Sequence, residues 1–443
     1  MTIRKSVGAT ALTLIISLSN QATAATNDDL LSAVESLKSQ LEAQQKQIST
    51  LQAELKKQKA KPAPKSVQDN GVEVSLKPAP SFKSADGKTT FALDGRIAVD
   101  TGFSTNDDAD LGDATDIRYL WLGMKGQVEE DWVYRFLVGL ENDATTVNDA
   151  FIGYQGFDGV FLQAGNFKEF NGIENMSSNL HNTFVERSSA TTTFRPLRTL
   201  GFGSTFYGDQ WSLQLGAFGD DPGNTAGDDE GKSVTGRFVV APIMEKDELL
   251  HLGVSARHRK PDADQDSVRF RSRGESNVID GRLVDTGVIA NVDDWQTYAV
   301  EGRYTYGPIA FMAEYNLTEV NRDGAADVEF DGGYVSASYF LTGEQRGYKV
   351  KNGTYGRVKP LDPFSLSEGG IGAWEIAARY SNLDLNDGPI LGGELDAYTV
   401  GLNWYPTAYS KFMLNYVINE TDQNGTTPNN DPHLIMLRSQ IDF

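Results

Sequence analysis

From residue 90 onwards, apolar and polar residues alternate with a period of two. Clear examples are Trp211, Leu213, Leu215 and Ala217, interleaved with Ser212, Gln214 and Gly216, and Tyr398, Val400, Leu402 and Trp404, interleaved with Thr399, Gly401 and Asn403. Each run is about ten residues long, the length that a tilted strand needs to cross the hydrocarbon of a membrane. The pattern predicts strands that have one apolar and one polar face.

Sixteen such runs can be counted, at residues 90–102, 115–128, 131–140, 147–155, 159–166, 197–207, 210–218, 232–241, 249–259, 294–306, 308–319, 329–341, 371–383, 395–405, 410–420 and 433–443. Tight turns at Glu129-Glu130, Gly208-Asp209 and Gly307 alternate with long polar loops at 103–114, 167–196, 219–231, 260–293, 384–394 and 421–432. Short turns at one rim and long loops at the other are typical of outer-membrane barrels. The sequence therefore predicts an all-β fold, a 16-stranded antiparallel transmembrane β-barrel over residues 90–443. Residues 342–370 are an exception, because they form a long connection on the short-turn side.

The last run supports a membrane barrel over a soluble β-sandwich, which would also show a period of two. Its apolar face ends in an aromatic residue and contains Ile435, Leu437, Ser439, Ile441 and Phe443. Outer-membrane barrels resemble one another in this ending. Aromatic residues near the ends of other runs fit the girdles found at membrane interfaces, namely Trp211, Tyr380, Trp404 and Tyr416.

Three segments precede the predicted barrel. Residues 1–24 have Arg4 and Lys5, then a short apolar stretch and an Ala22-Thr23-Ala24 cleavage site, which predict a secretory signal peptide. Residues 26–60 carry a heptad seam that predicts a short α-helical coiled coil and self-association, with one polar layer; its positions are Leu30, Val34, Leu37, Leu41, Gln44, Ile48, Leu51 and Leu55. Residues 61–89 are expected to be a linker.

Successive side chains of a strand point to opposite faces, so the residues between the lipid-facing ones are predicted to point into the barrel. These inward positions are charged, as a water-filled channel requires. The inward positions are Arg96, Arg135, Arg237, Arg257, Arg303, Arg379 and Arg438, with the acids Asp94, Asp100, Asp149, Glu301, Glu314, Glu375 and Asp442. Two interpretations stay open for the arginines. They form ion pairs that stiffen the wall, or they form a basic track that passes anions. Inward aromatic residues are few, Phe151 and Phe161, which ranks sugars below anions as solutes.

The loop 167–196 is the expected constriction, because a loop of this length in a compact fold usually has a function. It carries Lys168, Glu169, Glu174, Glu186, Arg187 and Arg195. A surface loop of mixed charge is the alternative. The loop 260–293 contains Arg269, Arg271 and Arg273 and is a weaker candidate for an external basic funnel.

Composition narrows the function further. The chain has 443 residues, a formal net charge of -21 and no cysteine, which argues against nucleic-acid binding and excludes disulfides. The four histidines show no metal-binding spacing, and no cofactor motif is present, so no cofactor is expected. His181 near Ser177 and Ser178 would imitate a barrel hydrolase, but a lone histidine beside serines is usually just part of a polar loop.

Residues 90–443 resemble the phosphate-selective porin O and P family. The most specific stretches are Asp94-Gly95-Arg96 with Asp100, Asp131-Trp132, residues 148–154 (NDAFIGY), Phe184-Val185-Glu186-Arg187, Leu341-Thr342-Gly343-Glu344 and Gly372-Ala373-Trp374-Glu375. The resemblance implies a trimer of 16-stranded barrels in outer-membrane lipid with an inward third loop. It also makes 342–370 a periplasmic connection.

The resemblance assigns part of an anion path. Arg96, Arg118 and Arg187 match pore arginines of the family, but Tyr119 replaces the second arginine of a pair. The lysine that phosphate-specific members carry in the third loop falls at Asn175, and a pore aspartate falls at Asn148. The prediction is thus a porin for small anions with a weak anion preference. The alternatives are a general or sugar-permeable porin and a structural barrel tethered through its coiled coil.

Overall fold

The computed structural model describes residues 38–39, 42–46, 49–50, 71–106, 111–141, 144–222, 230–262, 266–279, 281–423 and 429–443. The chain divides into two units, Met1–Val67 and Gln68–Phe443. In the first unit the described residues are helical. The signal peptide and, apart from Gln44, the heptad seam lie outside the described residues, so the coiled coil stays a prediction. No described helix is long and apolar enough to span a membrane.

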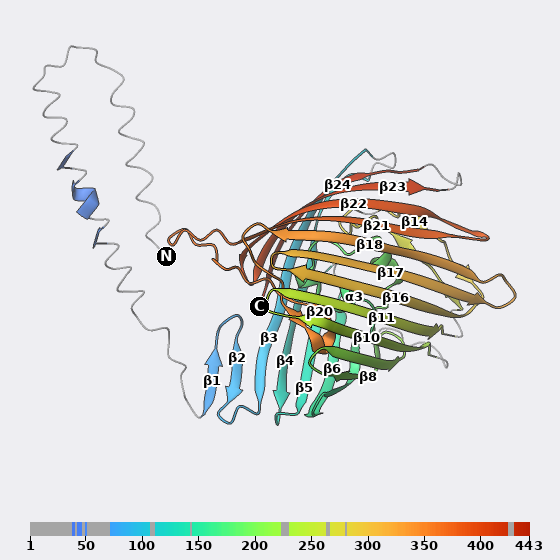
Figure 1. Cartoon of the computed structure of the whole chain (residues 1–443), viewed down its shortest axis with the longest axis horizontal. Coiled ribbons are helices and arrows are strands. Elements are labelled where there is room, and N and C mark those ends of the chain that lie inside the picture. The colour runs from blue at the N-terminus through green and yellow to red at the C-terminus, as the bar shows by residue number, and fades with distance from the viewer. Residues whose placement is uncertain are drawn as a thin grey trace, which may run out of the picture. The chain divides into compact units, whose positions relative to one another are not determined.

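The second unit contains a closed antiparallel barrel. Its described strands are β3 (Thr90–Thr105), β4 (Asp113–Val128), β5 (Trp132–Gly139), β6 (Thr146–Phe157), β7 (Val160–Lys168), β8 (Arg198–Tyr207), β9 (Trp211–Phe218), β10 (Lys232–Met244), β11 (Glu248–Lys260), β16 (Val292–Tyr306), β17 (Ile309–Arg322), β18 (Val328–Phe340), β21 (Ala373–Asp387), β22 (Ile390–Thr407), β23 (Ser410–Asp422) and β24 (His433–Asp442). Each pairs with the next along the chain, and β24 closes the barrel on β3, where Arg438 lies opposite Asp100. Figure 1 shows the strands side by side around the wall. The predicted 16-stranded barrel is confirmed.

The alternation of side chains explains why these strands face lipid on one side. In β24, Ile435, Leu437 and Ile441 are exposed on the outer face, whereas Arg438 and Asp442 are buried on the inner face. The backbone of Phe443 exchanges hydrogen bonds of 3.0 and 3.1 Å with Gly95. A Cβ at Gly95 would lie 2.4 Å from the Phe443 ring, so the glycine leaves room for this aromatic side chain.

One predicted long loop is wrong. Instead of the polar loop 384–394, only residues 388–389 separate β21 from β22. The hairpin continues because Leu383, Leu385 and Leu395 are fully buried in one apolar cluster. The intervening polar residues occupy the other face of the hairpin, and this made the segment look like a loop in the sequence.

The predicted linker 61–89 is also only partly correct. Its second half contains the hairpin β1 (Val72–Ser75) and β2 (Ser81–Ser84), and β2 pairs with the start of β3. Only β1 alternates apolar and polar residues, and strands of four residues are shorter than the windows that reveal a pattern. The sheet therefore begins before residue 90.

Three segments fold into the bore. The third loop, residues 169–197, contains α3 (Ile173–Met176), η1 (Asn179–His181) and α4 (Ser189–Phe194). The fifth loop, residues 261–291, contains β12 (Ser267–Val268), β13 (Arg271–Ser272), β14 (Val284–Asp285) and β15 (Ile289–Ala290). The third segment, residues 341–372, lies on the short-turn side and contains β19 (Tyr348–Lys349), η2 (Val350–Asn352) and β20 (Thr354–Tyr355); we call it the lower segment.

Apolar clusters attach the two loops to one half of the barrel. Phe194 of the third loop packs with Phe270 and Leu283 of the fifth loop against strands β16 to β22. A second cluster joins Val185 and Ile279 to side chains of β22, β23 and β24. Burial of these side chains fills that half of the bore and leaves an open passage along β3 to β9.

Candidate pore and constriction

The passage has a volume of about 1140 Å³. Strands β3 to β9 form one side, and the third loop and the lower segment form the other. Ten lysine and arginine residues line it, against two aspartates, Asp149 and Asp221, in the part of the chain that is described. The ten are Arg96, Arg118, Lys125, Arg135, Lys168, Arg187, Arg195, Arg198, Lys349 and Lys351.

Three of these cations, one just before the third loop and two within it, have no carboxylate within ion-pair distance among the described residues. Lys168 donates to the carbonyls of Asn175 and Ser177, at 2.5 and 3.0 Å. Arg187 donates to the carbonyls of Glu174 and Ser177, at 3.0 and 3.3 Å. Backbone carbonyls orient these side chains and supply no opposing formal charge.

Arg195 adds to the same field. Its Nε is buried and has no hydrogen-bond partner in the described structure. Burial, together with the nearby charges of Arg187 and Arg198, lowers the pKa of Arg195 to about 9. The group therefore stays protonated at neutral pH despite the mutual repulsion. Repulsion of this kind is relieved when an anion enters.

Arg118 reaches the passage through a β-bulge. The register between β3 and β4 shifts at Ala98, so that Tyr119 pairs with Ala98 and Ile117 pairs with Val99. The bulge lets Arg118 line the passage beside the inward Tyr119. Strict alternation would have placed it on the lipid side, and only the family resemblance indicated its role.

Glu186 neutralises Arg118 in part. It accepts from Arg118 Nε at 2.7 Å and from Arg438 at 2.8 Å. Burial alone would raise the pKa of Glu186, but the charges of Arg118 and Arg438 outweigh burial and lower it to about 2. The carboxylate is therefore ionised across the physiological range and fixes the third loop to the wall.

Ion pairs hold the predicted cation Arg135 and its neighbour Arg198, which was not predicted. Arg135 binds Asp94 at 2.6 Å and Asp149 at 3.2 Å, and Arg198 binds Asp149 at 2.8 Å. Arg96 contacts the side-chain oxygen of Asn179 in the third loop, and its guanidinium lies 4.3 Å from the ring centroid of Trp121. Arg96 is thus held without a carboxylate partner in the described residues.

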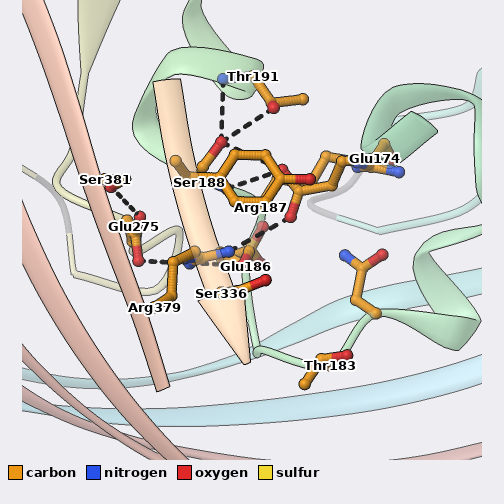
Figure 2. A network of polar contacts seen from close by, with 12 residues as sticks. Glu174, Thr183, Glu186, Arg187, Ser188, Thr191, Glu275, Ser336, Arg379 and Ser381 are labelled. Atoms are coloured by element: carbon orange, nitrogen blue, oxygen red, sulfur yellow. Dashed lines mark hydrogen bonds and ion pairs between the residues drawn. The ribbon is translucent and has the colours of Figure 1, made fainter. Parts of the chain in front are cut away.

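A buried network anchors the middle of the third loop (Figure 2). Glu174 accepts from the backbone and hydroxyl of Ser188, both at 3.1 Å, and from Arg379 at 3.3 Å. Arg379 also pairs with Glu275 of the fifth loop, and Glu275 accepts from Ser381 at 2.5 Å. One arginine of the wall therefore connects both inward loops.

Not every predicted site residue borders the passage. Six of them border it, namely Arg96, Arg118, Arg135, Lys168, Arg187 and Arg195. Arg303, Arg379 and Arg438 are buried between the wall and the inward segments, and Glu174 and Asn175 are buried inside the third loop. Arg438 pairs with Asp100 at 2.6 Å, and Arg303 lies 5.4 Å from the ring centroid of Tyr355. Their positions suit a role in holding the inward segments.

The lower segment contributes residues that the sequence did not reveal. Arg237 donates to the carbonyls of Asn352 and Gly353, at 2.9 and 2.8 Å, and thereby holds η2 inside the bore. This contact brings Lys349 and Lys351 to the passage. No sequence signal marks them, because their position depends on a long-range bond to β10.

One arginine of the fifth loop is neutralised by a neighbouring acid. Arg269 pairs with Asp285 at 2.5 Å, and this ion pair is exposed. The loop instead supplies Glu275 to the buried network. Of the three arginines of the predicted basic funnel, Arg269 is thus paired with an acid, and the funnel stays a prediction.

The described residues around His181 do not form a nucleophile–base pair. No hydrogen bond joins His181 to Ser177 or Ser178 in the described third loop, and Ser178 instead accepts from the backbone of Leu180 at 3.4 Å. Burial and the charge of Arg357 lower the pKa of His181 to about 2. Groups of three or more potential metal ligands were not found among the described residues.

Comparison with known proteins identifies the family. The phosphate-selective porin O and P family matches residues 91–443. The chain belongs to this family. An uncharacterised protein of Caulobacter vibrioides is 32% identical, over 84% of this chain and 76% of its own. Porin O of Pseudomonas aeruginosa is 27% identical, over 81% of this chain and 89% of its own.

Solved structures share the fold of this porin at low sequence identity. OmpT of Vibrio cholerae, in a trimer form, has a TM-score of 0.53 and 11% identity and covers 80% of this chain and 99% of its own. The channel DcaP of Acinetobacter baumannii has a TM-score of 0.52 and 14% identity, covering 82% and 99%. The chain is an outer-membrane porin that lets small polar solutes diffuse passively.

Proposed function

We propose that this porin prefers small anions, including oxyanions of the phosphate type. The observation that carries the proposal is the group formed by Lys168, Arg187 and Arg195, which lack carboxylate partners in the described structure and border one passage. A low-dielectric wall focuses such charge into the lumen and raises the local concentration of counter-ions. Arginine suits the task because its fork matches the oxygens of an oxyanion.

The charge that lines the lumen has the opposite sign to the net charge of the whole chain. The formal net charge is -21, yet the lining has ten cations and two acids. Counting Asp94 and Glu186, which pair with lining cations, raises the acids to four and still leaves a positive excess. Local charge governs the ions in a pore, so anion preference is compatible with an acidic protein.

Selectivity for phosphate over other anions is expected to be weak. Asn175, which replaces a third-loop lysine, is fully buried and does not border the passage. Asn148 borders it but supplies no charge. The proposal is therefore a general anion preference in which phosphate is one permeant ion.

The reversal potential tests this proposal. Purified protein in planar bilayers under a KCl gradient should give a zero-current potential of the sign that chloride permeation requires. Added inorganic phosphate should reduce the chloride current only at millimolar concentration, because the binding is loose. A reversal potential of the sign that potassium permeation requires would contradict the proposal.

We also propose that the homo-oligomer is a trimer. Strands β5 and β9 have only 8 residues each, β7 has 9 and β8 has 10. Strands β16 and β22, in contrast, have 15 and 18 residues. Strands near the lower limit for crossing hydrocarbon fit a wall that another subunit covers. The detergent-corrected mass of the purified protein should equal three chains, and a monomer mass would contradict this assignment.

A further inference from the structure

Aromatic rings line one side of the passage. We call this the aromatic wall and define it as Phe151, Phe161, Phe167 and Phe170, all of which border the passage. Phe151 and Phe167 pack edge to face with their centroids 6.2 Å apart, and Phe167 lies 6.1 Å from Phe170. The described structure thus contains more inward aromatic surface than strand parity indicated.

The local sequence makes space for these rings. A Cβ at Gly153 would lie 2.6 Å from the Phe161 ring, so the ring covers a glycine on the inner face of β6. Phe151 and Phe161 remain partly exposed to the lumen. The exposed parts of these rings offer an apolar surface to a solute in the water-filled pore.

A cation accompanies the aromatic wall. Lys351 Nζ lies 4.1 Å from the ring centroid of Phe161 and 5.1 Å from that of Tyr207. Lys351 forms no ion pair in the described part of the chain, and burial lowers its pKa. Lys168, at the end of the strand that carries Phe161, provides a second cation. Apolar and cationic surfaces therefore meet within one passage.

We infer that this passage binds small organic anions in which an aromatic ring carries a carboxylate, of which benzoate is the simplest. The ring would stack on Phe161 or on Phe151, where edge-to-face and offset contacts are favourable. The carboxylate would meet Lys351 or Lys168. A neutral sugar would use the rings but not the cations, and inorganic phosphate would use the cations but not the rings. The inference rests on the proposed anion preference and specifies its substrate class.

Competition between anions tests the inference. The chloride current of the full-length protein in planar bilayers is measured while benzoate or acetate, which share the carboxylate, is added. Benzoate should halve the current at a concentration at least tenfold below that of acetate. In Phe151→Ala/Phe161→Ala this ratio should fall below threefold. In Phe202→Ala, which removes a phenylalanine exposed on the lipid face of β8, the ratio should stay as in the natural protein.

The outcomes separate the inference from the proposed function. If benzoate and acetate act at equal concentrations in the natural protein while the reversal potential still indicates anion preference, the inference is wrong and the anion pore stands. A cation-selective reversal potential would refute both. If the double variant does not assemble, the benzoate-to-acetate ratio of the natural protein still decides. If the double variant assembles and its benzoate-to-acetate ratio is unchanged, Phe151 and Phe161 do not bind the aromatic ring, and the inference is wrong.

Discussion

Replacing Arg187 and Arg195 together by glutamine is expected to lower the chloride-to-potassium permeability ratio at least fivefold. Both side chains border the passage, and neither forms an ion pair in the described structure. A unit charge about 4 Å from an anion contributes about 1 kcal/mol even at the dielectric constant of water, and more in a narrow pore. About 1 kcal/mol per charge corresponds to a factor of about five in ion occupancy.

The effect should weaken as salt is raised, because mobile ions screen the lumen. Reversal potentials at low and high KCl measure it. Arg271→Gln is the matched control, since Arg271 is exposed on the fifth loop and does not border the passage. Equal permeability ratios in the double variant and in this control would show that the third-loop cations do not set the selectivity.

The strands of the barrel could be predicted from the sequence because lipid and water impose a period of two on every one of them. The inward positions of Arg135 and Arg379 followed from the same rule. The rule fails where the backbone departs from regular pairing. Arg118 is the clearest case, because a bulge that changes the parity leaves no mark in a pattern of apolar residues.

The inward segments could not be derived in this way. The third loop was indicated by its length, but its contacts depend on residues far apart in the chain, such as Arg438 with Glu186. The lower segment enters the bore because Arg237 binds its backbone. Such bonds are specified by three-dimensional proximity, which local patterns do not encode. The cations that line the passage also include Lys349 and Lys351, which were missed for this reason.

Loss of Arg379 is expected to release the third loop. In Arg379→Met, Glu174 and Glu275 both lose their charged partner inside the barrel. Removing one member of a buried ion pair costs about 3–5 kcal/mol, because a carboxylate is left in a low-dielectric site without compensation. The variant should unfold at a lower temperature in detergent. It should also show a higher and noisier single-channel conductance, since the loop would no longer stay fixed against the wall.

A control separates loosening of the loop from general destabilisation. Arg259 is buried and pairs with Asp220, but it contacts neither the third loop nor the passage in the described structure. Arg259→Met should therefore lower the unfolding temperature without changing conductance. Glu275→Gln offers a milder test, because it weakens the connection to the fifth loop and leaves the pair of Arg379 with Glu174 at 3.3 Å. It should increase current noise less than Arg379→Met does. Quiet channels of natural conductance in both variants would mean that this network does not hold the constriction in place.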